Sequence, residues 1–213
     1  MGTNAGQDTP SHRCNGLVLL SLSIQGMSQE KACQHMDIIT SGLCDPGLLE
    51  AELPELLEYL VNAIGAVIDT AGAQLDVYDT GAFRCFWVLN QLLASTPPGS
   101  VAHASAELYL TRLVNVRRES SLSELYQTFL PQLLKTLNAP CDVKEPCWDK
   151  SSPRRALFDT LCRRGGIACG QNMDIIVPIL VCHMGITREP TLRLAFLAQL
   201  ESMLQDDSMC KVL

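Results

Sequence analysis

The stretch from residue 173 to residue 205, MDIIVPILVCHMGITREPTLRLAFLAQLESMLQ, constrains the fold more than any other part of the sequence. Its apolar residues recur every three or four positions, stop at Gly185 and resume after Pro190. This spacing places the apolar side chains on one face of a helix. Glycine is common just after a helix ends, and proline is well tolerated in the first turn. The stretch therefore predicts two antiparallel helices joined near Gly185.

The same helical spacing runs through most of the chain, and the alternation typical of strands is nearly absent. Segments such as CDPG, STPPGS and CRRGG separate the helical runs, because glycine and proline interrupt helices. We therefore predict an all-α protein. Its expected helices span residues 14–25, 28–42, 48–69, 80–95, 101–116, 122–138, 152–165, 172–185 and 190–206.

Three of these helices share a phrase in which proline stands ahead of an apolar pair or run: ELPELLEYL, FLPQLLKTL and IVPILVCHM. The interval from Pro131 to Pro178 fits a repeat of about 40–47 residues, the length of HEAT and armadillo units. The interval from Pro54 to Pro131 fits nearly two such units. A single helix pair cannot bury both of its faces, so pairs of this kind stack. The expected architecture is an α-α superhelix, a HEAT/armadillo-like solenoid of antiparallel helix pairs.

The domain boundaries follow from the same pattern. Residues 1–13 are polar and predict a disordered N-terminal tail, and residues 14–213 predict the solenoid. Its units are expected at 14–47, 48–95, 96–165 and 166–206, where the third holds an extra helix and an inserted loop at 139–150.

Charge and hydropathy disfavour two classes of partner. The formal net charge is -7, and an acidic chain repels a phosphate backbone, so we expect no nucleic-acid partner. No uninterrupted apolar run reaches the length of about 18 residues that a membrane helix needs, so we expect no membrane span. The first residues, MGTNAGQDTP, lack the order of a signal peptide, which favours a cytoplasmic protein.

The ten cysteines lie mostly among aliphatic residues at helical spacing, which favours buried, reduced thiols. Cys162, Cys169, Cys182 and His183 lack the short spacing of a zinc site, so no metal and no cofactor is expected. No nucleophile elbow or phosphate loop is present either. We predict that the protein is not an enzyme; the alternative is a helical enzyme that uses Cys182 and His183.

Four residues are candidate protein-binding positions. Trp148 stands in the charged inserted loop, where it either caps the core or offers an exposed anchor to a partner, and we favour the cap. Tyr126, Arg154 and Arg155 are the other candidates.

Three longer phrases resemble one family, the HEAT-repeat dynein axonemal assembly factors. They are SSLSELYQTFLPQLLKTL, then SPRRALFDTLCRRGGIACGQNMDIIVPILVCHMG, and then EPTLRLAFLAQLESML, and together they cover about residues 120–205. Residues 48–95 are similar only loosely. The residues that match the family pattern are Leu125, Tyr126, Pro131, Leu133, Leu134, Ser152, Pro153, Val177, Pro178, Leu192, Arg193, Leu194 and Phe196.

The resemblance implies a partial chain from the later repeats of such a factor. It implies a non-catalytic scaffold that acts in the cytoplasmic preassembly of axonemal dynein arms for motile cilia or flagella. Its expected partners are axonemal dynein heavy or intermediate chains and other dynein assembly factors or chaperones. The alternative is a generic HEAT/armadillo adaptor in transport or signalling complexes, which would share the fold but not the partner.

Overall fold

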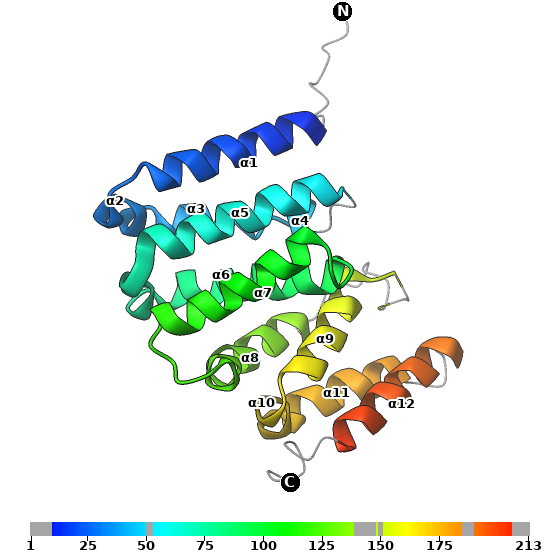
Figure 1. Cartoon of the computed structure of the whole chain (residues 1–213). Coiled ribbons are helices and arrows are strands. Elements are labelled where there is room, and N and C mark those ends of the chain that lie inside the picture. The colour runs from blue at the N-terminus through cyan, green and yellow to red at the C-terminus, as the bar shows by residue number, and fades with distance from the viewer. Residues whose placement is uncertain (1–9, 50–52, 139–147, 149–150, 185–189, 206–213) are drawn as a thin grey trace, which may run out of the picture. The chain divides into compact units, whose positions relative to one another are not determined.

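The structure, a computed structural model, describes residues 10–49, 53–138, 148, 151–184 and 190–205. Every regular element in these ranges is a helix and none is a strand, which confirms the all-α class (Figure 1). The elements are α1 (Pro10–Gln25), α2 (Gln29–Gln34), α3 (Met36–Leu43), α4 (Pro46–Leu49), α5 (Pro54–Ala71), the 3-10 helix η1 (Gly72–Asp76), α6 (Asp79–Ser95), α7 (Val101–Val116), α8 (Leu122–Asn138), α9 (Pro153–Arg164), α10 (Ile167–Gln171), α11 (Met173–Met184) and α12 (Pro190–Leu204).

The chain divides into two compact units, Met1–Arg118 and Glu119–Leu213. The boundary falls inside the segment 96–165 that the sequence predicts as one repeat, between α7 and α8. The superhelix and the repeat boundaries stay predictions.

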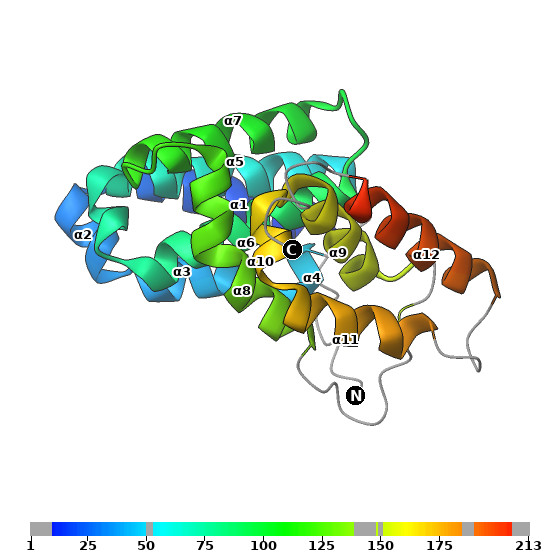
Figure 2. The ribbon, with the colours of Figure 1, turned by 90° about the horizontal axis from the view of Figure 1, so that it is seen from below.

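The helices of the first unit form two layers. In one layer α1 packs on α5 and α5 on α7; in the other α3 packs on α6 (Figures 1 and 2). The helix α5 lies between α1 and α7 in its own layer and also contacts α3 and α6 of the other layer. Its apolar residues recur around most of the helix, and Leu60, Ile64 and Ile68 are completely buried. Helix pairs packed in layers are the local arrangement that the apolar spacing predicts.

Gly65 sets the distance between α5 and α7. A Cβ atom placed on Gly65 would overlap the ring of Tyr109 on α7. The missing side chain therefore lets the tyrosine ring lie directly against the backbone of α5. Glycine in a helix interior costs about 0.5–1 kcal/mol relative to alanine, and here close packing offsets that cost.

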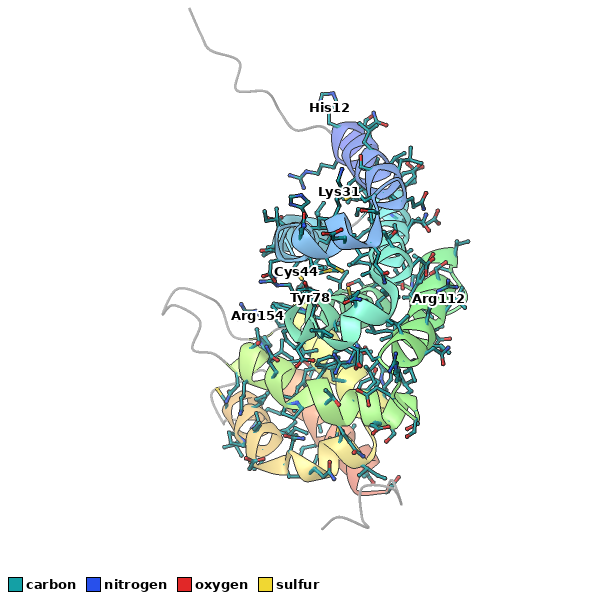
Figure 3. The ribbon with its side chains drawn as sticks, turned by 90° about the vertical axis from the view of Figure 1, so that its left-hand side faces the viewer. His12, Lys31, Cys44, Tyr78, Arg112 and Arg154 are labelled. Atoms are coloured by element: carbon teal, nitrogen blue, oxygen red, sulfur yellow. The ribbon has the colours of Figure 1, made fainter. Side chains whose placement is uncertain are left out.

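Three arginines connect helices of the first unit that are distant in sequence. Arg84 on α6 donates from Nη1 to the Asp37 carbonyl oxygen at 3.0 Å and to Thr40 Oγ1 at 3.2 Å, both on α3. Arg112 on α7 pairs with Asp69 on α5, and Figure 3 shows Arg112 at the outer surface.

The third arginine, Arg117, closes the end of α7 onto the start of α6. Its Nη1 donates to the Leu75 carbonyl oxygen at 3.0 Å and to Asp79 Oδ1 at 2.6 Å. Only 9% of the Arg117 side chain is exposed, so the charge is largely removed from water. The bond to the carbonyl of buried Leu75 contributes more than an exposed ion pair, because removing Arg117 takes this donor away from a buried residue, whereas the Asp79 side chain is 76% exposed and can bind water.

Among the described residues, one helix meets the length and composition of a membrane span. It is the continuous segment Pro54–Asp76, of which 61% of the apolar window is buried inside the protein. A core helix meets the same criterion, and α5 is the core helix of its unit.

In the described part of the second unit the helices are two pairs and a short connecting helix. The helix α8 contacts α9, α10 and α11, and α12 contacts both α9 and α11. Pro131 lies inside α8 and Pro178 inside α11, as the shared phrase predicts. Leu130 is completely buried and approaches Gly165, where α9 turns into α10.

Several element boundaries differ from the prediction. The expected helix 28–42 is interrupted at His35, whose backbone angles of φ -103° and ψ 7° separate α2 from α3. The expected helix 48–69 is two helices, because Pro54 has no N–H to continue a preceding turn and instead begins α5. The helix α1 begins at Pro10, so residues 10–13 are helical rather than part of a disordered tail. The predicted turn at Gly185 and residues 1–9, 139–147 and 149–150 lie outside the described residues.

Candidate protein-binding site

Tyr126 belongs to the buried face of α8. Its side chain is completely buried, together with those of Leu125, Leu130 and Leu133. The side chain therefore has no surface to offer a partner in this structure. We correct its assignment from a contact position to a core residue, because the 3.6-residue period of α8 turns it inward.

The start of α8 is held by a hydrogen-bonded cap. Ser121 Oγ accepts from the Glu124 backbone N–H at 3.3 Å, and Glu124 Oε2 accepts from the backbone N–H and the hydroxyl of Ser120, each at 2.6 Å. This reciprocal pattern satisfies helix N–H groups that would otherwise lack partners. The hydroxyl of Ser120, then its N–H, lowers the pKa of Glu124 below its usual value.

Trp148 packs onto α9. Only 7% of the residue is exposed, and its ring centroid lies 5.6 Å from that of Phe158, which is completely buried. A tilted aromatic pair at this separation is favourable. The burial supports the interpretation of Trp148 as a cap on the core and argues against an exposed anchor.

Arg154 and Arg155 lie in the first turn of α9 and are partly exposed. Arg155 Nε is 3.7 Å from Asp159 Oδ2, one turn further along the helix. Burial raises the pKa of Asp159, and the positive charges of Arg155 and Arg163 oppose that rise. Whether Arg154 and Arg155 contact a partner stays a prediction.

The structure therefore brings three of the four candidates to one helix. Trp148 lies against Phe158 of α9, and the two arginines begin that helix. Two further arginines, Arg163 and Arg164, lie in its last turn. With Asp159 as its one acidic residue, α9 is a basic helix in an acidic chain. It is the part of the second unit best suited to attract an acidic partner surface.

The thiols give no sign of a metal or nucleophilic centre in the described part of the chain. No group of three or more metal-ligating side chains occurs among these residues. The contact with Cys169, and then burial, raises the pKa of Cys162. Burial also raises the pKa of Cys85, and raises that of Cys44 to about 11. Figure 3 labels Cys44 at the end of α3. Thiols of this kind are poor nucleophiles.

The proposed alternative centre is only partly described. Cys182 is exposed on α11, and the side chain of His183 lies outside the described residues.

These observations define an all-α protein of layered helix pairs with a basic, partly exposed helix in its second unit. No family model matches the chain, and no solved structure matches it. The chain is similar to Dynein axonemal assembly factor 5 of Xenopus laevis, with 27% identity over 189 residues, and of Homo sapiens, with 23% identity over 197 residues. The resemblance that the sequence predicts is thereby confirmed.

The two matches cover 88% and 92% of this chain, so the similarity extends well beyond the predicted stretch 120–205. The chain spans 22% of the length of each of these relatives. It is therefore similar to one part of a much longer protein.

Proposed function

We propose that the protein is a non-catalytic HEAT-type scaffold that acts in the preassembly of axonemal dynein arms for motile cilia or flagella. The observation that carries the proposal is the similarity, over 88% and 92% of the chain, to two proteins named Dynein axonemal assembly factor 5. Layered helix pairs suit such a role, because they present long exposed helix faces rather than one deep pocket.

In this proposal the protein holds axonemal dynein heavy or intermediate chains while they assemble, together with other assembly factors or chaperones. The work takes place in the cytoplasm, before the arms are delivered to the axoneme. The proposed contact is the basic helix α9, whose first turn contains Arg154 and Arg155. In the proposal these two arginines pair with acidic side chains of a dynein subunit. Tyr126 and Trp148 act indirectly, because their burial supports α8 and α9.

The proposal is tested by capture from ciliated cells. The tagged protein is purified, and the dynein heavy and intermediate chains that co-purify are quantified by mass spectrometry. We expect both classes in the wild-type capture and at least about a tenfold loss in the double variant R154A/R155A, the size of effect that a few central contacts produce. The matched control is K31A/K135A, which removes two exposed positive charges from α2 and α8, outside the proposed contact, and should leave the capture unchanged.

Two results would count against the proposal. One is wild-type capture that contains no dynein chain, together with normal dynein arms in cells that lack the protein. The other is capture of transport or signalling complexes alone, which would favour the generic adaptor. An unchanged capture by R154A/R155A would remove α9 as the contact and leave the scaffold role intact.

A further inference from the structure

A groove lies on the first unit where α1 packs along α5, and Tyr109 of α7 lines one side of it. The hollow measures about 280 Å³. Leu17, Leu22, Tyr59 and Tyr109 supply its apolar lining, and Gln25 and Asn62 supply polar groups. We call this hollow the α1–α5 groove. It is far from α9 in sequence, and the residues that line it are all in the unit Met1–Arg118.

The groove has an exposed apolar edge. Leu22 is 59% exposed, and its neighbour on the same helix, Leu19, is 65% exposed. Tyr59, which lines the groove from α5, is 37% exposed. Removing apolar surface from water is favourable, so covering this edge would stabilise a complex.

The size of the hollow limits its occupant. A volume of about 280 Å³ lies just below the range of sites that enclose small molecules. It suits one or two side chains of a partner protein. The lining offers few polar groups, so an extended peptide would leave many of its own N–H and C=O groups without partners. A helix satisfies these groups internally and needs only side-chain contacts.

The charge beside the groove indicates which sign of charge a partner surface should carry. No lining residue is charged. Glu55 and Glu58 lie on α5 one turn before Tyr59 and Asn62, so they border the groove at one end. Residues 1–118 hold twelve acidic residues against six Lys and Arg, and Arg84, Arg112 and Arg117 are already paired with aspartates. A positively charged partner is therefore favoured.

We propose that the α1–α5 groove docks a basic amphipathic helix of a partner protein. An aliphatic side chain of that helix enters the hollow between Leu22 and Tyr59, and a Lys or Arg one turn away lies beside Glu55 and Glu58. The inference goes beyond the proposed function, because it concerns the other unit and does not depend on which assembly the protein serves.

The test uses the purified full chain and a short fluorescein-labelled helical peptide of leucine and lysine, with leucine at positions i, i+3, i+4 and i+7. Fluorescence anisotropy gives the Kd. The double variant L22S/Y59S should weaken binding at least about tenfold. The matched control L108S changes an equally exposed leucine on α7 outside the groove, and its Kd should stay within about twofold of wild type.

A second pair of variants tests the charge. E55K/E58K reverses the charge of the two side chains beside the groove and should weaken peptide binding at least about tenfold. The control E30K/D76K makes the same change in net charge at exposed positions elsewhere and should weaken binding less than about threefold. Wild-type chain that fails to bind the peptide would overturn the proposal. Equal losses in a variant and its control would overturn it too, because they would indicate general attraction between a basic peptide and an acidic protein. All substituted side chains are at least partly exposed, and circular dichroism verifies that each variant folds.

Discussion

The contact between Gly65 and Tyr109 predicts that adding one methyl group will destabilise the first unit. Alanine at a helix position normally stabilises a protein by about 0.5–1 kcal/mol relative to glycine. At Gly65 the new methyl group would overlap the Tyr109 ring. Overpacking of a well-packed contact costs about 1–3 kcal/mol. We therefore expect Gly65→Ala to lower the free energy of unfolding by about 1 kcal/mol, the difference between the central values of these two effects.

Removing the Tyr109 ring should reverse the sign of the Gly65→Ala effect on the free energy of unfolding. In a Tyr109→Ala background the methyl group has no ring to meet, so Gly65→Ala should raise the free energy of unfolding by about 0.5–1 kcal/mol. The coupling between the two positions is then about 2 kcal/mol, within the range of residues in direct contact. Gly16 is the matched control, because it lies inside α1 and a Cβ there would meet nothing within 4 Å. Gly16→Ala should stabilise in both backgrounds.

The assay is urea unfolding followed by tryptophan fluorescence. The sequence has two tryptophans, and Trp87 lies in the first unit and Trp148 in the second. A Trp148→Phe background therefore makes the signal report on the first unit alone. If Gly65→Ala stabilised this unit, or if the effects of the two substitutions were additive, the close approach of α5 and α7 would be refuted.

The remaining predictions concern buried contacts and thiols. Arg117→Ala should lower the free energy of unfolding of the first unit by about 1–3 kcal/mol in urea unfolding, because its acceptors lose their buried donor. The control is Arg112→Ala, which removes an exposed ion pair and should cost less than about 1 kcal/mol. Equal costs would contradict the burial of the Arg117 side chain. Trp148→Ala should cost the second unit about 3 kcal/mol in circular-dichroism melts, and a cost below about 1 kcal/mol would mean that the ring does not cover the core. Native alkylation by iodoacetamide, mapped by mass spectrometry, should modify exposed Cys182 and leave Cys85 unmodified until urea is added; rapid modification of Cys85 in the native protein would contradict its burial.

Local sequence signals were sufficient to predict most helices. The expected helices 101–116 and 122–138 coincide with α7 and α8. Both have clear local boundaries: Ser100 caps α7 by accepting from the His103 N–H at 3.2 Å, and Ser121 does the same for α8. Caps and apolar period are readable from neighbouring residues, which is why these bounds could be predicted.

The errors in the predicted helices arose where tertiary packing, rather than local sequence, determines the helix boundaries. The apolar pattern continues through His35, and only the packing of α2 on α5 and of α3 on α6 explains why the chain turns there. The short helix α10 lies against α8, and its five residues are too few to show a period. Pro54 is an exception, since a proline inside an expected helix was a local signal for a boundary.

The candidate site could be predicted only in part. An amphipathic pattern shows that one face is buried, but the aromatic side chains of Tyr126 and Trp148 suit either a core or an interface. The contact of Gly65 with Tyr109 joins residues far apart in sequence and could not be derived from spacing. Its one local sign was a glycine in the middle of a long apolar helix, which commonly marks a close approach.

The arginine bonds of the first unit also bear on how the chain is made. Arg84 and Arg117 each reach back by 38 to 47 residues, and each finds its acceptors on a segment that leaves the ribosome earlier. A newly synthesised helix can therefore dock on helices that are already folded, before the rest of the polypeptide has been made. Folding from the N-terminus during synthesis would shorten the time for which the apolar surface of α5 is exposed to solvent. A nascent protein is most prone to aggregate while such a surface is exposed.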